Sequence, residues 1–399
     1  MTETRPAWAA GTVSLDPVRA VVLIDHPIQH FAPALRTLTS RSDVRVRAYY
    51  WHDAADGMPD PAFGRHVRWN VDLHSGYDWW APPAGRSRWH RTGALLRELR
   101  RHRPELILCF GWHSPIARLG ILFARLTGTP LLYYGDTNGR IPTRGWRGRL
   151  RRLVLRRLFR WSAGAISTGT FNHDFYLAHG MSARHIHPGV VPTDVEEFRA
   201  ASTDRSRAGT MSDRPLVIGF AGKFVPSKGL DDLVRAAAEL PRDRRWALWV
   251  IGDGPQRPDI ERLVTRFGLD DRVWLLGFRN TDELPALMGS VDIMVMPSRQ
   301  EPRGLVAVEA MAAGAATVVS SATGLWGTGD VVAHEHTGLV YPAGDVAALT
   351  AVLRRLIDDP DLRTRLASAG QERALAYGPR QFAASTAVAL ASTARRYRG

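Results

Sequence analysis

The feature that most constrains this chain is a regular alternation of strand-like apolar runs with helical patterns along its whole length. In the first half we expect strands over residues 20–24, 44–50, 105–110, 130–134 and 164–167. Helical patterns lie between most of these runs, for example over 115–126 and 146–160. Strands that alternate with helices in this way predict α/β architecture with parallel sheets.

The alternation restarts after RAASTDRSRAGTMSDR (199–214), a polar stretch without periodicity that predicts a linker or an exposed loop. Further strands are expected over 215–222, 246–252, 272–277, 291–297 and 316–320. A chain of 399 residues is also too long for one ordinary core. The sequence therefore predicts two Rossmann-like halves facing a cleft, with ligands beyond the carboxyl ends of the strands.

Composition limits the class of protein without deciding its function. The formal net charge is +14, from 53 basic and 39 acidic residues. Such a charge suits nucleic acid, an anionic membrane surface or a nucleotide, and it also fits an arginine-rich composition with no partner. The single cysteine, Cys109, lies in the apolar run ELILCF and is expected to be a buried core thiol. We expect a reducing, cytoplasmic setting, with no secretory signal and no membrane-spanning segment.

A basic loop follows the first strand of the second half. GKFVPSKG (222–229) places Lys223 and Lys228 where a helix begins. Two ammonium groups and the amides of a helix N-terminus suit a diphosphate, although the spacing is not that of a Walker loop. Taken alone, the same loop is equally consistent with a solvated basic turn.

Two glutamates, Glu301 and Glu309, enclose the run EPRGLVAVE. On one continuous helix they would lie about 12 Å apart along the axis and about 80° apart around it. That separation is too wide for the paired carboxylates of a glycosidase. We expect Glu301 before a helix that begins near Gly304, and Glu309 on its inner face, so that both accept hydrogen bonds from one polyol. The alternative is a first-turn glutamate and one stray internal carboxylate.

Together with VIGDGP (250–255), LGF (276–278) and HTGLVYPAGD (336–345), these stretches resemble the donor domain of the retaining nucleotide-sugar glycosyltransferases of family 4, which have the GT-B fold. The resemblance is strong over about 215–370 and weaker over 19–200. In the weaker part, DHPIQHFAPALRTL (25–38) is similar to the opening loop of a bacterial subgroup.

The resemblance implies three regions. Residues 1–200 would form an acceptor-binding domain, and residues 201–375 a donor-binding domain. Residues 376–399 would form a helix that packs back on the first domain.

The resemblance also implies roles for the donor-site residues. Lys223 and Lys228 match the basic pair that neutralises the leaving diphosphate. Glu301 matches the glutamate that lies against the donor sugar, and Glu309 the one that holds the ribose hydroxyls.

Other positions match the phosphate and nucleobase pockets. Gly304 and Leu305 lie where the amides at the helix start approach the phosphate, Gly222 opens the basic loop, and Phe278 lies at the nucleobase pocket. Arg303 stands where the family usually has an apolar or aromatic residue. We expect this arginine to point to solvent, the alternative being contact with a phosphate or an acidic sugar.

Acceptor-side candidates lie in the first half. His113 matches the active-site histidine near the primary hydroxyl of the sugar, and Asp136 and Asn138 lie on the next strand-end loop. The remaining acceptor-binding candidates are His26, Gln29, His30 and Trp112.

The function that the resemblance implies is retaining transfer of a hexose from a nucleotide diphosphate. UDP is one candidate carrier, and the sequence leaves the choice among UDP, GDP and dTDP open. The acceptor would be a hydroxyl of a small natural product or a glycan. We expect no obligatory metal, because the one Asp-x-Asp triplet, Asp359-Pro360-Asp361, is typical of turn capping. Alternatives are an envelope acceptor at a membrane, another enzyme on the same fold such as a phosphorylase or an epimerase, or a basic nucleic-acid-binding protein. We expect no nucleic-acid partner, because no recognised binding motif is present.

The most basic segment is RGWRGRLRRLVLRRLFRW (144–161). Its apolar residues fall at helical spacing on one side: Trp146, Leu150, Leu153, Leu158 and Trp161. One interpretation is a helix on an anionic membrane, which would place the protein peripherally at the inner membrane face. The other is a packed helix whose arginines are solvated.

Overall fold

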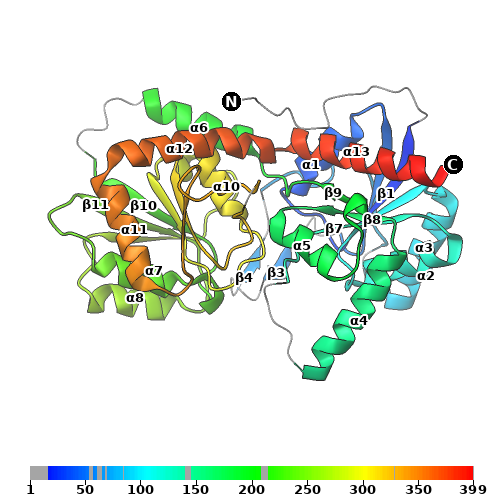
Figure 1. The fold of residues 1–399 in the computed structure, drawn as a ribbon, viewed down its shortest axis with the longest axis horizontal. Coiled ribbons are helices and arrows are strands. Elements are labelled where there is room, and N and C mark those ends of the chain that lie inside the picture. The colour runs from blue at the N-terminus through cyan, green and yellow to red at the C-terminus, as the bar shows by residue number, and fades with distance from the viewer. Residues whose placement is uncertain are drawn as a thin grey trace.

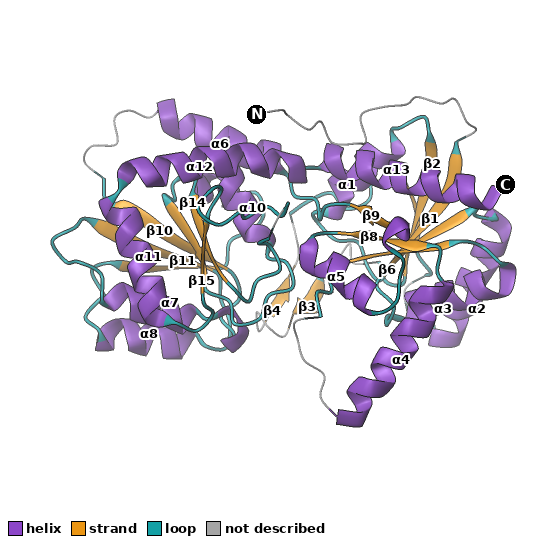
Figure 2. Cartoon of the chain, in the orientation of Figure 1, coloured by secondary structure: helices purple, strands orange, loops and turns teal. Residues whose placement is uncertain are grey.

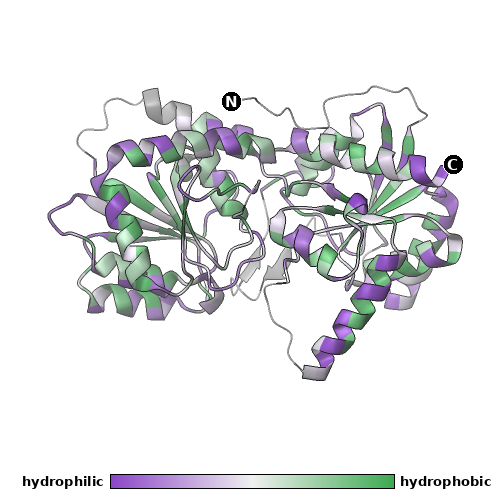
Figure 3. Cartoon of the chain, viewed as in Figure 1, coloured by the Kyte–Doolittle hydropathy of each residue, from purple (hydrophilic) through white to green (hydrophobic). Residues whose placement is uncertain are grey.

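The computed structural model describes residues 17–53, 57–60, 65–67, 70–83, 85–139, 145–207, 214–327 and 329–398. Two lobes lie side by side, each built on a sheet with helices on both faces (Figures 1 and 2). The strands are the most apolar elements of both lobes (Figure 3). The structure thus has the two-domain α/β architecture that the alternating pattern predicts.

The N-terminal lobe contains a seven-stranded parallel sheet in the order β5-β2-β1-β6-β7-β8-β9. Its strands are β1 (Val18–Ile24), β2 (Val44–Tyr50), β5 (Asp78–Trp80), β6 (Leu106–Phe110), β7 (Leu131–Gly135), β8 (Gly164–Ser167) and β9 (Ile186–Pro188). Its helices are α1 (Phe31–Thr39), α2 (Arg88–His102), α3 (Pro115–Thr127), α4 (Gly145–Trp161) and α5 (Thr170–Ala178). The edge strands β5 and β9 were not expected, because three residues are too few to show a period.

The C-terminal lobe contains a six-stranded parallel sheet in the order β12-β11-β10-β13-β14-β15. Its strands are β10 (Leu216–Ala221), β11 (Trp246–Ile251), β12 (Val273–Gly277), β13 (Ile293–Met296), β14 (Ala316–Ser320) and β15 (Leu339–Tyr341). Its helices are α7 (Leu230–Ala238), α8 (Arg257–Arg266), α9 (Leu284–Gly289), α10 (Leu305–Ala312), α11 (Val346–Asp358) and α12 (Pro360–Ala374). A separate antiparallel ribbon joins β3 (Met58–Asp60) to β4 (Arg65–Val67).

Each sheet has one point where the strand order reverses. In the first sheet the reversal lies between β1 and β6, and in the second it lies between β10 and β13. Loops that follow such a pair of strands diverge and leave a crevice at the carboxyl edge, where ligands bind in open α/β sheets. The loops after β10 and β13 are the basic loop and the loop with Glu301, so the topology brings these two stretches together.

The predicted linker is wrong for most of its length. Residues 199–207 belong to helix α6 (Val195–Arg207), which packs on α9 and α10 and buries Phe198. Glu196 and Glu197 in its first turn favour the helix, because carboxylates interact well with a helix N-terminus. Residues 208–213 lie outside the described part of the chain.

The last helix, α13 (Pro379–Arg398), packs against α1 of the N-terminal lobe. Phe382 and Leu390 are fully buried in the same apolar cluster as the β1 strand. In Figure 1, α12 and α13 follow one another from the C-terminal lobe onto the N-terminal lobe. The last helix therefore packs on the lobe that contains β1.

Candidate functional site

A cleft of about 570 Å³ lies between the lobes at the carboxyl edges of both sheets. Most of the residues predicted for a donor or acceptor site line it: Gln29, His30, Asp136, Gly222, Lys223, Lys228, Phe278, Glu301, Arg303, Gly304, Leu305 and Glu309. They come from loops that are far apart in the sequence. Their convergence depends on the strand order just described.

The loops after β10 and β13 are joined directly by hydrogen bonds. The backbone N–H groups of Arg299 and Gln300 donate to the carbonyl of Ser227 at 2.8 and 3.1 Å. The guanidinium of Arg299 also pairs with Asp231 and Asp232, at 2.8 and 2.6 Å, in the first turn of α7. These contacts fix the position of one loop relative to the other, so that Lys228 and Glu301 face one another.

Lys228 and Glu301 form an ion pair within the cleft. The Glu301 side chain is 9% exposed and that of Lys228 is 27% exposed. A cation in this position can approach an anionic ligand while its neighbour, a carboxylate, accepts hydrogen bonds from hydroxyl groups. The pair thus offers both kinds of contact that a sugar phosphate needs.

Glycines allow both loops to turn into their helices. Gly229 has φ +64°, and a Cβ there would lie 2.1 Å from the carbonyl oxygen of Pro297. Gly304 has φ +86°, and a Cβ there would lie 2.2 Å from the methyl group of Met296. A larger residue at Gly229 would push the two loops apart, and at Gly304 the left-handed backbone itself favours glycine. Gly304 directly precedes α10, whose first N–H groups therefore lie at the cleft.

Glu309 lies inside α10, on the side that faces the cleft. Its Oε1 accepts a hydrogen bond of 3.1 Å from the hydroxyl of Thr193, in the segment that crosses between the lobes. Burial raises the pKa of Glu309 to about 7, and the hydrogen bond from Thr193 opposes this rise. The hydrogen bond from Thr193 only partly offsets the loss of hydration of this carboxyl group, so the group is well suited to accept hydrogen bonds from a ligand.

The expectation that Arg303 points to solvent is wrong. Arg303 is 5% exposed. Its Nη1 lies 3.4 Å from Asp330 Oδ1 and donates to the carbonyl of Gly324 at 3.2 Å. Asp330 Oδ2 in turn accepts from the N–H of Thr170, the first residue of α5. The arginine is held inward because a buried carboxylate of the same lobe pairs with it and also caps a helix of the other lobe.

The second guanidinium nitrogen of Arg303 has a different environment. Nη2 is buried and has no hydrogen-bond partner within the described part of the chain. The side chain also lines the cleft and lies within electrostatic range of Asp136. A buried N–H group without a partner is costly, so this nitrogen is well suited to a ligand oxygen.

Two side chains of the N-terminal lobe complete the cleft, and burial alters the pKa of both. Burial raises the pKa of Asp136, and the positive charge of Arg303 partly opposes that rise. Burial lowers the pKa of His30 to about 4. His30 is therefore a neutral imidazole at physiological pH.

Four predicted residues do not line the cleft. Asn138 donates from Nδ2 to the carbonyl of Pro302 at 3.1 Å, so it connects the lobes directly. The Trp112 ring stacks on Phe175 at 5.7 Å, which directs it to the core beneath α5 rather than to a ligand. The other two residues are His26 and His113.

His26 and His113 instead surround Asp25, which follows β1. The neighbouring ring of His26, whose Nδ1 lies 3.6 Å from Asp25 Oδ2, lowers the pKa of Asp25, and His52 and His113 lower it further through their charges. His113 itself is exposed at the end of β6. The sequence singled out two of these histidines but missed Asp25 and His52, which only the order of β1, β2 and β6 brings together.

The sequence also missed Thr193 and Asp330. Thr193 lies in an ordinary segment, VVPTDV, and Asp330 lies in the glycine-rich stretch TGLWGTGDVV, which has no regular pattern. The triplet that starts at Asp359 acts as expected: Asp359 Oδ1 accepts from the N–H of Leu362 at 2.8 Å and caps α12.

Comparisons with known proteins bear on the family of the C-terminal lobe and on the fold of both lobes. The sequence profile of the family described as "Glycosyl transferases group 1" matches residues 202–373, which include the basic loop, Glu301 and Glu309. The C-terminal half of this chain is a group 1 glycosyltransferase domain. The recognition drawn from the basic loop and the two glutamates is thereby confirmed.

Individual relatives share about half of their length with the chain. A 2-deoxystreptamine glucosyltransferase of Streptomyces kanamyceticus is 37% identical over 211 residues, which is 50% of this chain and 54% of the relative. A lipopolysaccharide core biosynthesis glycosyltransferase of Rhizobium meliloti is 38% identical over 169 residues, covering 42% of this chain and 46% of the relative. The chain thus spans about half the length of the curated relatives it matches.

Solved structures show that the fold extends over both lobes. HepE of Anabaena, crystallised in complex with UDP, superposes with a TM-score of 0.70 and covers 94% of this chain and 100% of its own, at 19% identity. The lipopolysaccharide glycosyltransferase WaaG superposes with a TM-score of 0.59 at 16% identity, covering 92% of this chain and 98% of its own. The GT-B fold predicted for the chain is confirmed.

Metal sites and membrane spans are both absent from the described residues. No group of three or more His, Cys, Asp or Glu side chains in this part of the chain is placed to hold a metal ion. None of the helices described above is long and apolar enough to cross a membrane.

Proposed function

We propose that this protein is a retaining glycosyltransferase that moves a hexose from a UDP-linked donor to an acceptor hydroxyl. The observation that carries the proposal is the convergence of Lys223, Lys228, Glu301 and Glu309 on one cleft at the start of α10. The group 1 profile supports the class of reaction, and the complex of HepE with UDP supports the choice of carrier.

In this proposal the diphosphate lies between the basic loop and the start of α10. Lys223 and Lys228 neutralise the negative charge that develops on the leaving phosphate, and the N–H groups of Gly304 and Leu305 add the positive end of the helix dipole. Lys228 then exchanges part of its pairing with Glu301 for the phosphate. Stabilisation of this kind lowers the barrier because the charged groups already lie beside the leaving phosphate and need little rearrangement.

The two glutamates would hold different parts of the donor. Glu301, beside Lys228, accepts hydrogen bonds from hydroxyls of the transferred sugar, and Glu309, deeper in α10, accepts them from the ribose. Neither role requires a covalent intermediate. We propose retention by attack of the acceptor on the same face from which the phosphate leaves, with a phosphate oxygen taking the proton of the acceptor hydroxyl.

The acceptor would enter from the N-terminal lobe, whose Gln29, His30 and Asp136 line the opposite wall. We propose a hydroxyl of a small natural product or a glycan as acceptor. By its name, the first relative described above acts on 2-deoxystreptamine, a small molecule. The name of the second places it in the biosynthesis of the lipopolysaccharide core, a glycan.

The proposal is tested by measuring the melting temperature with UDP, GDP and dTDP at equal concentrations, followed by release of UDP from UDP-hexoses. UDP at 100 times its dissociation constant should stabilise the native state by about 2.7 kcal/mol, and the other two should have smaller effects. Stabilisation by GDP or dTDP but not by UDP would overturn the choice of donor. The absence of stabilisation by all three would overturn the site itself.

A further inference from the structure

Helix α4 has two apolar stripes, and the fold covers only one of them. Gly148, Leu155 and Phe159 are buried against the lobe. At about 100° per residue, these three positions lie within roughly 40° of one another around the helix. The stripe on the opposite side of the helix is exposed, with Trp146 at 69%, Leu150 at 52%, Leu153 at 65% and Val154 at 55%.

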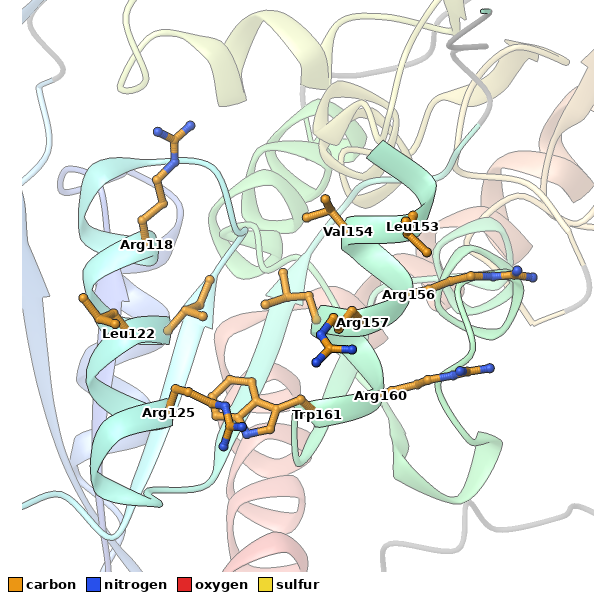
Figure 4. A pocket seen from close by; sticks show the side chains of 11 residues that line it. Arg118, Leu122, Arg125, Leu153, Val154, Arg156, Arg157, Arg160 and Trp161 are labelled. Carbon is orange, nitrogen blue, oxygen red and sulfur yellow. The ribbon is translucent and has the colours of Figure 1, made fainter. Parts of the chain in front are cut away.

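Helix α3 extends this exposed apolar surface. Leu122 is 50% exposed and Leu126 is 76% exposed. Between α3 and α4 lies an open groove of about 880 Å³. Figure 4 shows Leu122 on α3 and Val154 on α4, on either side of this groove, with Trp161 at one end. Contiguous exposed apolar patches of this kind mark sites that bind a membrane, a protein or an apolar ligand.

The same two helices have a strong positive charge. Helix α4 contains seven arginines and no acidic residue, and α3 adds Arg118 and Arg125 without an acidic residue. None of the arginines of α4 forms an ion pair with a carboxylate of the described residues. Arg156 and Arg160 point away from the groove, while Arg157 points into it (Figure 4). The guanidinium groups therefore surround the apolar stripe and are available to anions.

We propose that the exposed face of α3 and α4 docks on an anionic phospholipid bilayer. The leucines, Val154 and Trp146 enter the boundary between headgroups and acyl chains, and the arginines bind the phosphates around them. An amphipathic helix with arginines beside an exposed apolar stripe has the pattern of interfacial helices. Nucleic acid would use the arginines but would leave the aliphatic side chains in water.

Docking in this way places the cleft close to the lipid surface. Figure 1 shows α4 projecting from the N-terminal lobe, away from its sheet. Asp136, which lines the cleft, lies nine positions before Gly145, the first residue of α4. The docking itself does not depend on the proposed sugar transfer.

The test is co-sedimentation of the full chain with vesicles at physiological ionic strength. One set consists of phosphatidylcholine alone, and the other of equal parts phosphatidylcholine and phosphatidylglycerol. We expect binding to the second set only. Leu150→Ser/Leu153→Ser should weaken binding by about tenfold or more, because the inserted apolar area is lost. Arg149→Gln/Arg152→Gln should weaken it by about 25-fold, since each basic residue near such a surface contributes about fivefold.

Matched variants elsewhere on the surface separate a local effect from a general one. Leu177→Ser/Val388→Ser removes exposed apolar side chains of α5 and α13, and Arg235→Gln/Arg262→Gln removes exposed charges of α7 and α8. Both should bind vesicles like the wild type. Equal binding by the α4 leucine variant and the wild type would overturn the proposal, as would equal binding to both kinds of vesicle or to neither.

Two further readouts identify the partner. Tryptophan emission of the wild type should be quenched by vesicles with brominated acyl chains, and Trp146→Phe should reduce that quenching. Fluorescence anisotropy with a single-stranded oligonucleotide tests the competing class of partner. Tight, salt-sensitive binding of the oligonucleotide that survives Leu150→Ser/Leu153→Ser, without vesicle binding, would assign the surface to nucleic acid instead.

Discussion

The substitution Glu309→Gln should make the protein more stable in alkaline solution while removing donor binding. Glu309 is half-buried in α10, and removal from water raises its pKa from 4.5 to about 7. Between these pH values the folded protein holds a proton that the unfolded chain has lost. Stability is therefore lost as the pH rises through this window, and the full cost is present above about pH 7.

The size of this cost follows from the two pKa values. The difference between 4.5 and about 7 corresponds to about 3 kcal/mol, at 1.36 kcal/mol for each pH unit. Glutamine resembles the protonated carboxyl and can still accept the hydrogen bond from Thr193. In a domain of this size, about 3 kcal/mol raises the melting temperature by roughly 6–12 °C. Glu309→Gln should thus melt higher than the wild type at pH 8.5 and close to it at pH 5.

The assay is a melting curve at both pH values for the wild type, Glu309→Gln and Glu239→Gln, whose side chain is exposed. The control should melt like the wild type throughout. Isothermal titration should show that Glu309→Gln binds UDP much more weakly, because an amide replaces the carboxylate that accepts from the ribose. The reasoning is refuted if the gain in melting temperature is the same at pH 5 and pH 8.5. Unchanged UDP affinity would remove Glu309 from the donor site.

Two further substitutions test the ion pairs of the cleft. Lys228→Ala should reduce the rate of UDP release by a factor of about 100 or more, because the diphosphate loses a positioned cation. The circular dichroism spectrum should remain that of the wild type, and turnover at the wild-type rate would contradict the assignment. Arg303→Leu should destabilise the protein by about 3–5 kcal/mol, since it leaves the buried carboxylate of Asp330 unpaired. Adding Asp330→Asn should recover part of that loss in chemical denaturation, and the same loss in the double variant would show that the pair is not its source.

Much of the fold could be predicted because its signals are local. An apolar run such as that of β1 must be buried, and the start of α10 follows from the glycine at 304. The basic loop and the two glutamates were also visible, since each is a short pattern beside a strand. Local patterns failed only where elements are very short, as in β5, β9 and β15, or where a polar composition concealed a helix, as in α6.

The environment of single side chains was much harder to predict. Arg303 looks like a surface residue, because its partner, Asp330, lies 27 positions away in a loop without a regular pattern. Trp112 was expected at the acceptor site, but Phe175 draws its ring into the core. The sequence did not predict a role for Asp25, because the histidines that approach it follow three different strands.

The sequence by itself therefore determined which functional groups the chain has, namely the basic loop, the two glutamates and a basic amphipathic helix. Periodicity and residue type are properties of neighbours in the chain, and they are sufficient for that. Only the tertiary structure decided which of these groups share a cleft, and which apolar stripe of α4 is left exposed. Both outcomes depend on strand order and on contacts between distant segments, which no local pattern records.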